Sequence, residues 1–500
     1  MFEDEHHGQE ANESSAELAF RIHWLGLGMV AAIGGGGTAP WSLGIVAVLG
    51  VIGLVLTGAN QHAYGDKTRE FVLRFLFWML PVWVVTAAFF VGHYFSPYHQ
   101  ITVGGIKSWE LSPLPASWVP VSTSFKVAGM GVLLAVGVYA STVNALLLCK
   151  SRLVFARTWT ALVICAGVLA LLGLLQYAGH ADQLLWAIPM KNNRFFASFP
   201  HPALWSAFAI LWMSAGFGLL GWLVSQRGWN WQSMEGWLIL GCTALLAASI
   251  AVIGDPLYQI LGALVASLGC LVIAWQTRQE RRRTGKRSGL GAAIPAWLAA
   301  GLLFAAGAAF VTAKYPTSEW IRYDGQTPDW PLHARVIEDT RNMWSQRKWL
   351  GWGYNSFPVV YSFFQGADLN DTYHAVARSD FWQSLAEHGI IGTVLWWIPA
   401  LCIVGKLLLQ RRLLKFLLAP LAGLAAIAIL SLVDFPFICP AIFFGFWLIL
   451  FSVVRWNEVD KADAVFDPGE RKRMEQKRMQ GKTLAKHPAT FATPSSKPKA

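Results

Sequence analysis

Charged residues are scarce in this sequence. Asp, Glu, Lys and Arg together make up 14% of the 500 residues, whereas hydrophobic residues make up 55%. Soluble globular proteins carry about 25% charged residues. The composition therefore excludes a soluble enzyme of the ordinary type and favours an integral membrane protein.

Cysteine pairs and metal-ligand patterns are lacking as well. None of the six cysteines forms a C-x-x-C pair or stands at metal-ligand spacing from histidines. All lie within or at the ends of apolar runs, and we interpret them as buried hydrophobic residues: Cys149, Cys165, Cys242, Cys270, Cys402 and Cys439. The segment ADLND, with Asp368 and Asp371, comes nearest to a carboxylate pair, and turn formation explains it at least as well. We predict no metal site and no cofactor.

A cleavable signal peptide is not recognisable. The segment MFEDEHHGQEANESS is acidic and polar and has no basic n-region. We expect the first apolar run to direct insertion into the membrane.

Apolar runs of about 20 residues, the length that crosses a bilayer core, recur along the chain. They predict an all-α, polytopic membrane protein with about twelve transmembrane helices. The predicted spans are 18–35, 40–58, 72–95, 127–149, 154–176, 203–225, 235–253, 256–276, 291–312, 388–408, 414–433 and 437–454.

The net charge of +11 is spread unevenly. With the N-terminus inside, the basic residues of the short loops fall on the cytoplasmic side, and GGGGTAP, GDP and DFPF on the other side carry no Lys or Arg. The cytoplasmic set is Lys67, Arg69, Lys150, Arg152, Arg157, the block from Arg278 to Arg287, Lys406, Arg411, Arg412, Lys415 and the tail from Arg455 to Lys499. We predict that both termini are cytoplasmic and that the basic segments contact anionic lipid headgroups rather than nucleic acid.

Five segments follow from this topology. We expect a cytoplasmic N-terminal segment (1–17), nine spans with short loops (18–312), a long outer loop (313–387), three further spans (388–455) and a basic, disordered tail (456–500). A polar loop this long between spans is usually functional. The outer loop is therefore the first place to look for chemistry.

The position of the ionisable groups distinguishes two classes of function. Ion-coupled transporters usually carry acids or bases near the bilayer midplane. Here Asp255 and Asp434 fall at predicted outer helix ends, where turn and capping roles explain them. Chemistry at the outer surface is the favoured interpretation, and a transporter is the alternative.

A first group of candidate residues precedes the span at 203. Lys191, Arg194 and His201 lie in the segment MKNNRFFASFPHP. An arginine there can simply extend its head group to the lipid interface. Its guanidinium can also hold phosphate through planar, forked donors.

A second group lies in the outer loop, in RVIEDTRNMWSQRKWLGWGYNSF. Arg335 and Asp339 stand at helical spacing, and Glu338 and Arg341 are expected to form a local ion pair. Because Glu338 is expected to pair with Arg341, Arg335 is the second arginine predicted to bind phosphate.

A third group lies in YHAVARSDFWQSLAEHGIIG. His374 can deprotonate a hydroxyl nucleophile, although a lone histidine is more often structural. Ser379 is a plausible N-cap for the helix that follows. Arg378 would add positive charge, and Asp380 and Gln383 would orient the base or the acceptor.

Four segments, in this order and topology, resemble the O-antigen ligase and O-antigen polymerase family of bacterial membrane glycosyltransferases. They are NRFFASFPHPALWSAF, RNMWSQRKWLGWGYNSF, ARSDFWQSLAEHGIIG and SLVDFPFICPAIFFGF. The resemblance covers roughly 190–450 and is densest between 335 and 395. It implies transfer of a glycan from a polyprenyl diphosphate carrier to an acceptor hydroxyl, with inversion and without a metal, at the periplasmic face of the bacterial inner membrane.

The resemblance also assigns roles. Arg194 and Arg335 correspond to the family arginines that bind the diphosphate, and His374 to the late histidine taken as base. The family often has His-Asn before this helix, where the chain has Arg378-Ser379, so His201 is kept as a second candidate base. Lys191, Arg378, Asp380 and Gln383 are the predicted substrate contacts. Ligase, repeat-unit polymerase, transporter and non-catalytic scaffold stay open as alternatives. The predicted acceptor is a lipid or a glycan, and a protein acceptor stays open as well.

Overall fold

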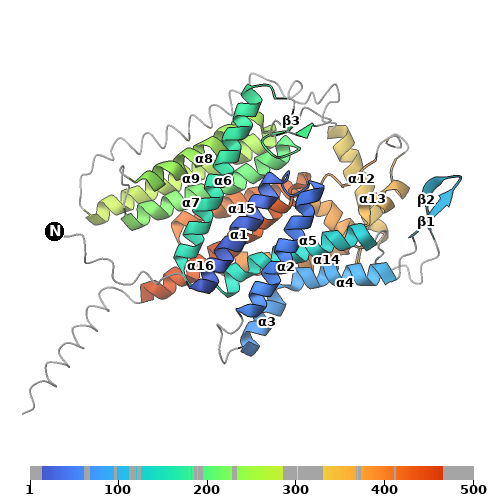
Figure 1. Ribbon diagram of the computed structural model, residues 1–500, viewed down its shortest axis with the longest axis horizontal. Coiled ribbons are helices and arrows are strands. Elements are labelled where there is room, and N and C mark those ends of the chain that lie inside the picture. The colour runs from blue at the N-terminus through green and yellow to red at the C-terminus, as the bar shows by residue number, and fades with distance from the viewer. Residues whose placement is uncertain are drawn as a thin grey trace, which may run out of the picture.

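The chain forms an all-helical membrane protein (Figure 1). The computed structural model describes residues 14–60, 68–94, 98–111, 120, 125–181, 183–184, 188–189, 195–227, 233–284, 301, 330–366, 369, 373–409 and 413–465. Ten helices in these ranges are long and apolar enough to span a membrane, or eleven if a bent pair counts as one span. The predicted fold class is confirmed. The predicted span 291–312 lies outside the described residues except for Gly301.

The helices before the long loop are α1 (Ser15–Ile33), α2 (Pro40–Ala59), α3 (Thr68–Trp78), α4 (Leu80–Tyr94), α5 (Phe125–Leu147), α6 (Arg152–Ala178), α7 (Pro202–Arg227), α8 (Met234–Ile253) and α9 (Pro256–Thr284). The later helices are α12 (Trp330–Gln346), α13 (Phe357–Val360), α14 (Asp380–Leu409), α15 (Leu418–Val433) and α16 (Pro440–Val465), with short 3-10 turns η3 (Tyr361–Phe363), η5 (Lys415–Leu417) and η6 (Pro436–Ile438). Two small antiparallel hairpins, β1 (Tyr98–Val103) with β2 (Ile106–Leu111) and β3 (Gln183–Leu184) with β4 (Ile188–Pro189), complete the described elements.

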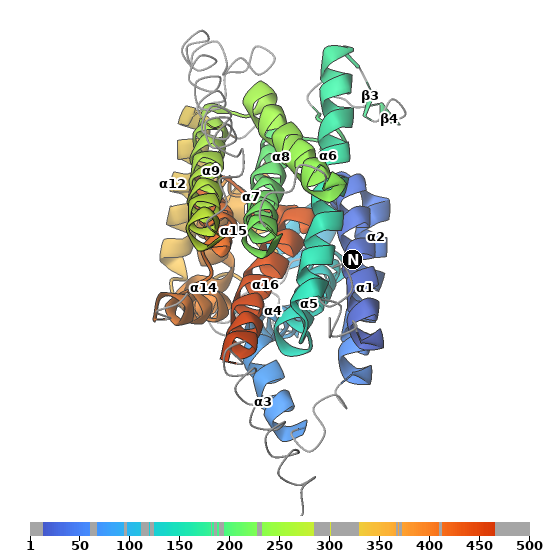
Figure 2. The ribbon, with the colours of Figure 1, turned by 90° about the vertical axis from the view of Figure 1, so that its left-hand side faces the viewer.

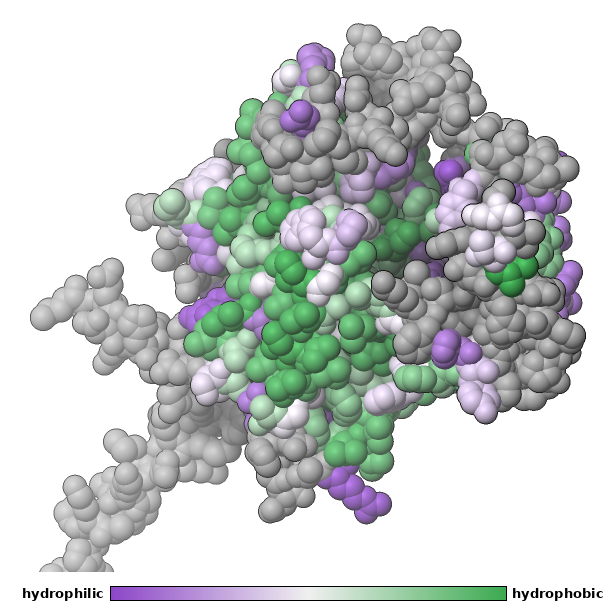
Figure 3. Space-filling view, turned by 45° about the vertical axis from the view of Figure 1, so that its right-hand side comes forward, coloured by the Kyte–Doolittle hydropathy of each residue, from purple (hydrophilic) through white to green (hydrophobic). Residues whose placement is uncertain are grey.

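α7 is the most enclosed of the spans, and α6, α8, α9, α15 and α16 pack around it (Figure 2). Trp205 and Trp212 on α7 are almost fully buried. By contrast, α2 exposes a stripe of large apolar side chains at helical spacing: Trp41, Ile45, Val48, Ile52 and Val55. Figure 3 shows a broad hydrophobic area across the middle of one face, with hydrophilic residues at its margins. Side chains exposed in this way fit contact with lipid.

Two predicted spans differ from the structure. The span 72–95 is a helix pair, α3 and α4, bent by 63° at Met79. Pro81 explains the bend, because it has no N–H to donate to the preceding turn. The span 388–408 is part of the longer helix α14, which begins at Asp380 and is interrupted by a non-helical residue, Gly389.

Polar contacts at one end of the bundle, here called the terminal end, tie the start of α1 and the later part of α16 to the loop between α5 and α6. Glu17 accepts hydrogen bonds from the backbone N–H groups of Lys150 (2.7 Å) and Ser151 (2.9 Å), between α5 and α6. Arg455 Nε of α16 donates to the Cys149 carbonyl at 2.7 Å. These contacts join loops that the charge pattern assigns to one side.

The opposite end, here called the loop end, collects the turns assigned to the other side. Cys439 Sγ, before α16, donates to the Gly36 carbonyl between α1 and α2 at 2.9 Å. Ser198 Oγ, before α7, donates to the Ala32 carbonyl at 2.6 Å. α12 and α13 lie beside α14 at the right of Figure 1, whereas α16 ends at the lower left.

Candidate functional site

The start of α14 is fixed on the turn between α15 and α16. Ser379 Oγ accepts from the Trp382 N–H at 3.3 Å, so the predicted N-cap is confirmed, and it donates to the Leu432 carbonyl at 2.9 Å. Asp380 Oδ2 accepts from the Phe437 N–H at 2.8 Å, and the Asp380 N–H donates to the Asp434 carbonyl at 3.1 Å. Segments more than fifty residues apart in sequence therefore hold this helix end in place.

Asp434 is the polar centre of that turn. The Tyr258 hydroxyl of α9 donates to its Oδ2, and the Phe435 N–H donates to its Oδ1 at 2.8 Å. Burial raises the pKa of Asp434, while these hydrogen bonds and the positive charge of Arg378 act in the opposite direction. Arg378 itself has a positive φ of 58°, a conformation that costs energy for a non-glycine residue. Arg378 thus has a strained backbone conformation, and its positive charge acts on the Asp434 carboxyl group.

His374 is buried against α12 and η3. Its ring meets the Tyr361 ring edge to face at 5.7 Å, and the Tyr361 hydroxyl donates to Asp339 Oδ2 of α12 at 3.3 Å. Burial lowers the pKa of His374, the charge of Arg378 lowers it further, and Asp339 raises it in part. The imidazole is consequently favoured in its neutral form, the form that can accept a proton.

Gln383 and Glu387 connect α14 to the loop segments around it. Gln383 Oε1 accepts from the Ala377 N–H at 3.2 Å, and its Nε2 donates to Glu387 Oε1 at 3.3 Å. Glu387 also accepts from the backbone N–H groups of Asn355 (2.9 Å) and Phe357 (3.3 Å). The buried Glu387 carboxyl group therefore fixes the segment that leads into α13.

Gly389 lets the backbone at Lys348 and Trp349 pack directly against α14. At Gly389 (φ 64°, ψ −173°) α14 is interrupted, and the N–H groups of Ile390 and Ile391 donate to the carbonyls of Lys348 (2.8 Å) and Trp349 (3.1 Å). A Cβ on Gly389 would lie 2.3 Å from the Trp349 backbone. Only glycine allows these two backbone segments to come this close.

A cavity of about 900 Å³ lies between this region and the membrane helices. Its wall is built by residues of α2, α4, α5, α13, α14, α15, the α15–α16 turn and α16, together with loop residues 354–355, 373 and 375–376. One part of the lining is polar, with Asn355, Asp380, Gln383, Glu387 and His388. Another part is aromatic, with Trp396, Trp397, Phe443 and Trp447. The cavity thus suits a ligand with a polar group and an apolar chain.

Some of the predicted site residues line this cavity and others do not. Asp380 and Gln383 line it. His374 does not, although its neighbours Tyr373 and Ala375 do. The structure therefore brings Asp380, Gln383, His374 and Arg378 into one region, of which the first two reach the cavity.

Arg335 lies apart, on the exposed face of α12. Its side chain is 55% exposed and pairs with Glu338 at 3.8 Å. The expected ion pair of Glu338 with Arg341 is wrong, because Arg335 is the arginine that pairs with Glu338, and Arg341 lies over the Trp382 ring at 5.9 Å. Arg347 likewise lies over an aromatic ring, that of Trp352, at 4.1 Å. The described arginines around α12 thus contact aromatic and acidic side chains.

Of the three candidate residues before α7, the structure describes His201. Its Nδ1 accepts from the Ala203 N–H at 3.3 Å, a contact typical of a helix N-terminus. Lys191 and Arg194 lie outside the described residues, as do Asp368 and Asp371. Among the residues that the structure describes, no cluster of three or more His, Cys, Asp or Glu side chains is arranged to hold a metal ion.

Glu387, His388 and Tyr354 line the cavity but were not among the predicted site residues. The sequence contains a signal for two of them. Asp380, Gln383, Ser384, Glu387 and His388 recur at intervals of three and four, which places them on one face of a helix at the start of an apolar run. A polar stripe of this kind in a span predicts a functional surface.

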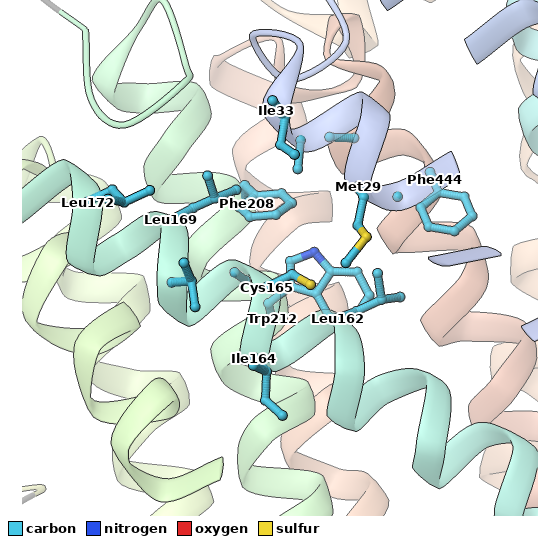
Figure 4. Close-up of a pocket in the computed structure, with 15 residues that line it drawn as sticks. Met29, Ile33, Leu162, Ile164, Cys165, Leu169, Leu172, Phe208, Trp212 and Phe444 are labelled. Carbon is cyan, nitrogen blue, oxygen red and sulfur yellow. The ribbon is translucent and has the colours of Figure 1, made fainter. Parts of the chain in front are cut away.

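A second, smaller cavity of about 340 Å³ lies between α1, α6, α7 and α16 (Figure 4). Met29, Leu162, Phe208 and Phe444 are among the apolar side chains around it. This lining fits hydrocarbon, and the thiol of Cys165 is its one titratable group.

Comparison with known proteins finds no matching family model and no matching curated relative. The resemblance to the O-antigen ligase and polymerase family therefore stays a prediction from the four sequence segments. What is established is a multi-pass, all-helical protein with a large cavity between the elements of the long loop and the membrane helices, lined by both polar and apolar side chains.

Proposed function

We propose that the chain is a membrane glycosyltransferase that moves a glycan from a polyprenyl diphosphate carrier to an acceptor hydroxyl. The observation that carries the proposal is the cavity, whose lining passes from carboxyl, amide and imidazole groups to tryptophans of the spans. A lipid-linked sugar has the same division between a polar group and a hydrocarbon chain.

The reaction needs a base and a group that stabilises the leaving diphosphate. The acceptor oxygen forms a bond to the anomeric carbon, the bond from that carbon to the diphosphate oxygen breaks, and the acceptor proton passes to the base. His374 is the proposed base, since its environment favours the neutral imidazole. Asp380 and Gln383, which line the cavity, would orient the acceptor.

Arginines are the proposed partners of the diphosphate. Guanidinium groups neutralise charge that develops on the leaving oxygens. We assign this role to Arg194 and Arg335, with Arg378 and Lys191 as further positive charges and His201 as the second candidate base. Ligation and repeat-unit polymerisation share this chemistry and differ in the acceptor.

We further propose that the protein lies in the bacterial inner membrane with both termini in the cytoplasm. The separation of the basic loops from the uncharged turns supports this orientation. The contacts that join Glu17 to Lys150, and Arg455 to Cys149, support it as well, because they connect segments that the charge pattern assigns to the same side.

The test is glycan transfer in proteoliposomes from a polyprenyl diphosphate donor. We expect Arg194→Ala, Arg335→Ala and His374→Ala each to reduce transfer by about 100-fold or more at normal folded yield. Arg74→Ala is the matched control, because Arg74 is also an exposed arginine in a helical ion pair, with Glu70 at 2.6 Å on α3. Full activity of His374→Ala would contradict the assignment of the base.

A further inference from the structure

α3 turns away from the helix that follows it. This helix of 11 residues lies at 63° to α4, with the bend beside Met79, and it leaves the bundle at that angle (Figure 1, Figure 2). The Tyr139 hydroxyl of α5 donates to the Trp78 carbonyl at 2.8 Å. The Trp78 ring meets the Phe451 ring of α16 edge to face, with centroids 6.2 Å apart. Contacts with two spans therefore hold the end of α3 and fix its direction.

The lengths of α3 and α4 do not fit one upright crossing. α4 has 15 residues and measures about 22 Å, whereas a bilayer core is about 30 Å thick. A straight helix of both lengths would measure about 39 Å and exceed the core. At 63° to α4, α3 adds about 7 Å along the direction of α4. With α4 along the membrane normal, the bent pair therefore matches the core, and α3 runs obliquely within one leaflet.

One face of α3 packs on the bundle and a second face is apolar but uncovered. Phe71 is buried and Phe75 is partly buried against the core. The second face consists of exposed apolar side chains, namely Val72, Leu73, Leu76 and Phe77. Between 41% and 58% of each of these side chains is exposed. A contiguous apolar surface of this kind marks a contact with lipid or with another protein.

Charge and continuity favour lipid as the partner of this face. Arg74 pairs with Glu70 at 2.6 Å, and Arg69 is exposed in the first turn of α3. These three residues leave one net positive charge, which complements the phosphate of lipid headgroups. On α4, Trp83 and Phe90 are 43% and 60% exposed and stand seven residues apart on one side of the helix. The exposed apolar surface thus continues from α3 onto a helix that itself faces the bilayer.

We propose that α3 is an amphipathic interfacial helix that lies obliquely in one bilayer leaflet. Its uncovered apolar face contacts the acyl chains of phospholipids, and its charged side chains lie at the level of the phosphate headgroups. Helices that combine an apolar face with a charged one bind membranes in this way. The inference depends on the membrane architecture and does not depend on the proposed transferase.

The experiment places a nitroxide label on single added cysteines of the full chain in phospholipid nanodiscs. All variants also carry Cys402→Ser, because Cys402 is the exposed native cysteine, and this chain alone gives the background. The labelled α3 positions are Arg69→Cys, Glu70→Cys, Leu73→Cys and Leu76→Cys. Electron paramagnetic resonance measures collisions of each label with oxygen, which concentrates in lipid, and with a water-soluble nickel chelate. The ratio of the two collision rates reports the depth of the label.

Two positions serve as matched controls. Val48→Cys replaces a side chain that is 61% exposed within α2, and Met234→Cys replaces one that is 82% exposed at the start of α8. We expect the oxygen-to-nickel ratio at Leu73 to resemble that at Val48 and to exceed that at Met234 by about tenfold. The ratio at Glu70 should resemble that at Met234.

Depth along α3 gives a second measure. Arg69 and Leu76 stand seven residues apart, on one side of the helix. Their labels should differ in depth by about 5 Å if α3 is oblique, and by about 10 Å if it is upright.

Three results would overturn the proposal. Frequent nickel collisions at Leu73 and Leu76, as at Met234, would place α3 in water. Rare collisions with both reagents would show that protein, such as a second copy of the chain, covers this face. A depth difference of about 10 Å would make α3 an upright part of a span. Thermal unfolding checks that each labelled chain is folded, and Val72→Cys on the same face replaces a variant that is not.

Discussion

At the scale of single residues, the protonation of His374 depends on two neighbours with opposite effects. Burial and Arg378 lower its pKa, and Asp339 raises it. If His374 is the base, transfer requires the neutral ring and is lost as the pH falls through the pKa. That pKa lies below the usual value of about 6.5, so activity near neutral pH should change little with small changes in pH.

Substitution of Arg378 and substitution of Asp339 should shift the acid limb of the pH profile, where transfer is lost as the pH falls, in opposite directions. Arg378→Ala removes a positive charge, so the pKa of His374 rises and transfer is lost at a higher pH than in the wild type. Asp339→Asn removes the stabilising negative charge, so the pKa falls and transfer persists to lower pH. The measurement is a pH profile of transfer, each variant normalised to its own maximum. Identical acid limbs in the wild type and both variants would show that His374 does not govern the rate.

Gly389 offers a test of the helix interruption. Gly389→Ala combines an unfavourable positive φ with a contact of 2.3 Å to the Trp349 backbone, and we expect a loss of about 3 kcal/mol or more in stability. Gly405→Ala in the same helix is the control, because a Cβ there meets nothing within 4 Å. Thermal unfolding in nanodiscs measures both variants. Equal melting temperatures would mean that the close approach of Gly389 to Trp349 is not required.

At the scale of elements, α14 joins the long loop to the membrane helices. Its first turn is bonded to the α15–α16 turn through Asp380, and Glu387 binds the backbone ahead of α13. Its second part, after Gly389, carries Trp396 and Trp397 into the cavity wall. One helix thus presents both the polar and the aromatic part of the lining.

Glu387→Ala should release the segment that Glu387 holds. The N–H groups of Asn355 and Phe357 would lose their acceptor, and we expect their hydrogen exchange to become at least about tenfold faster. Glu338→Ala is the control, because Glu338 is exposed and pairs only with Arg335 at 3.8 Å in the described residues. Exchange is measured by mass spectrometry on peptides covering 350–366. Unchanged protection in Glu387→Ala would contradict this role.

Several element boundaries follow directly from the sequence. The spans predicted at 40–58 and 235–253 correspond to α2 (Pro40–Ala59) and α8 (Met234–Ile253), because turn-forming residues bound an uninterrupted apolar run. The bend at Met79 had a local signal in Pro81 that hydropathy does not register. The start of α14 at Asp380 agrees with the predicted N-cap, Ser379. The predicted span began only at 388, because Asp380, Gln383, Ser384 and Glu387 interrupt the apolar pattern before it.

At the scale of the whole molecule, the charge pattern predicted which loops lie together, and the contacts of the loop end agree with it. Gly36 and Cys439 are in contact although about four hundred residues separate them. The cavity could not be predicted in this way, because its wall combines residues as distant as Leu43 on α2 and Trp447 on α16. Hydropathy and spacing describe single helices and contain no information about which helices meet.

The orientation of the molecule is testable by labelling. Glu338→Cys on α12 should react with a membrane-impermeant maleimide in intact spheroplasts, since α12 belongs to the predicted periplasmic loop. Met234→Cys at the start of α8 is 82% exposed as methionine and should react only after permeabilisation. The chain without added cysteine gives the background. The reverse pattern would invert the proposed topology.

The central claim is transfer of a glycan from a lipid diphosphate, and its most direct measurement is the stoichiometry of the products in wild-type proteoliposomes. We predict one polyprenyl diphosphate released for each new glycosidic bond, with inverted anomeric configuration and in the presence of a metal chelator. Mass spectrometry and nuclear magnetic resonance of the two products measure these quantities. Donor that crosses the bilayer unchanged, with no new glycosidic bond, would contradict the claim and favour a transporter.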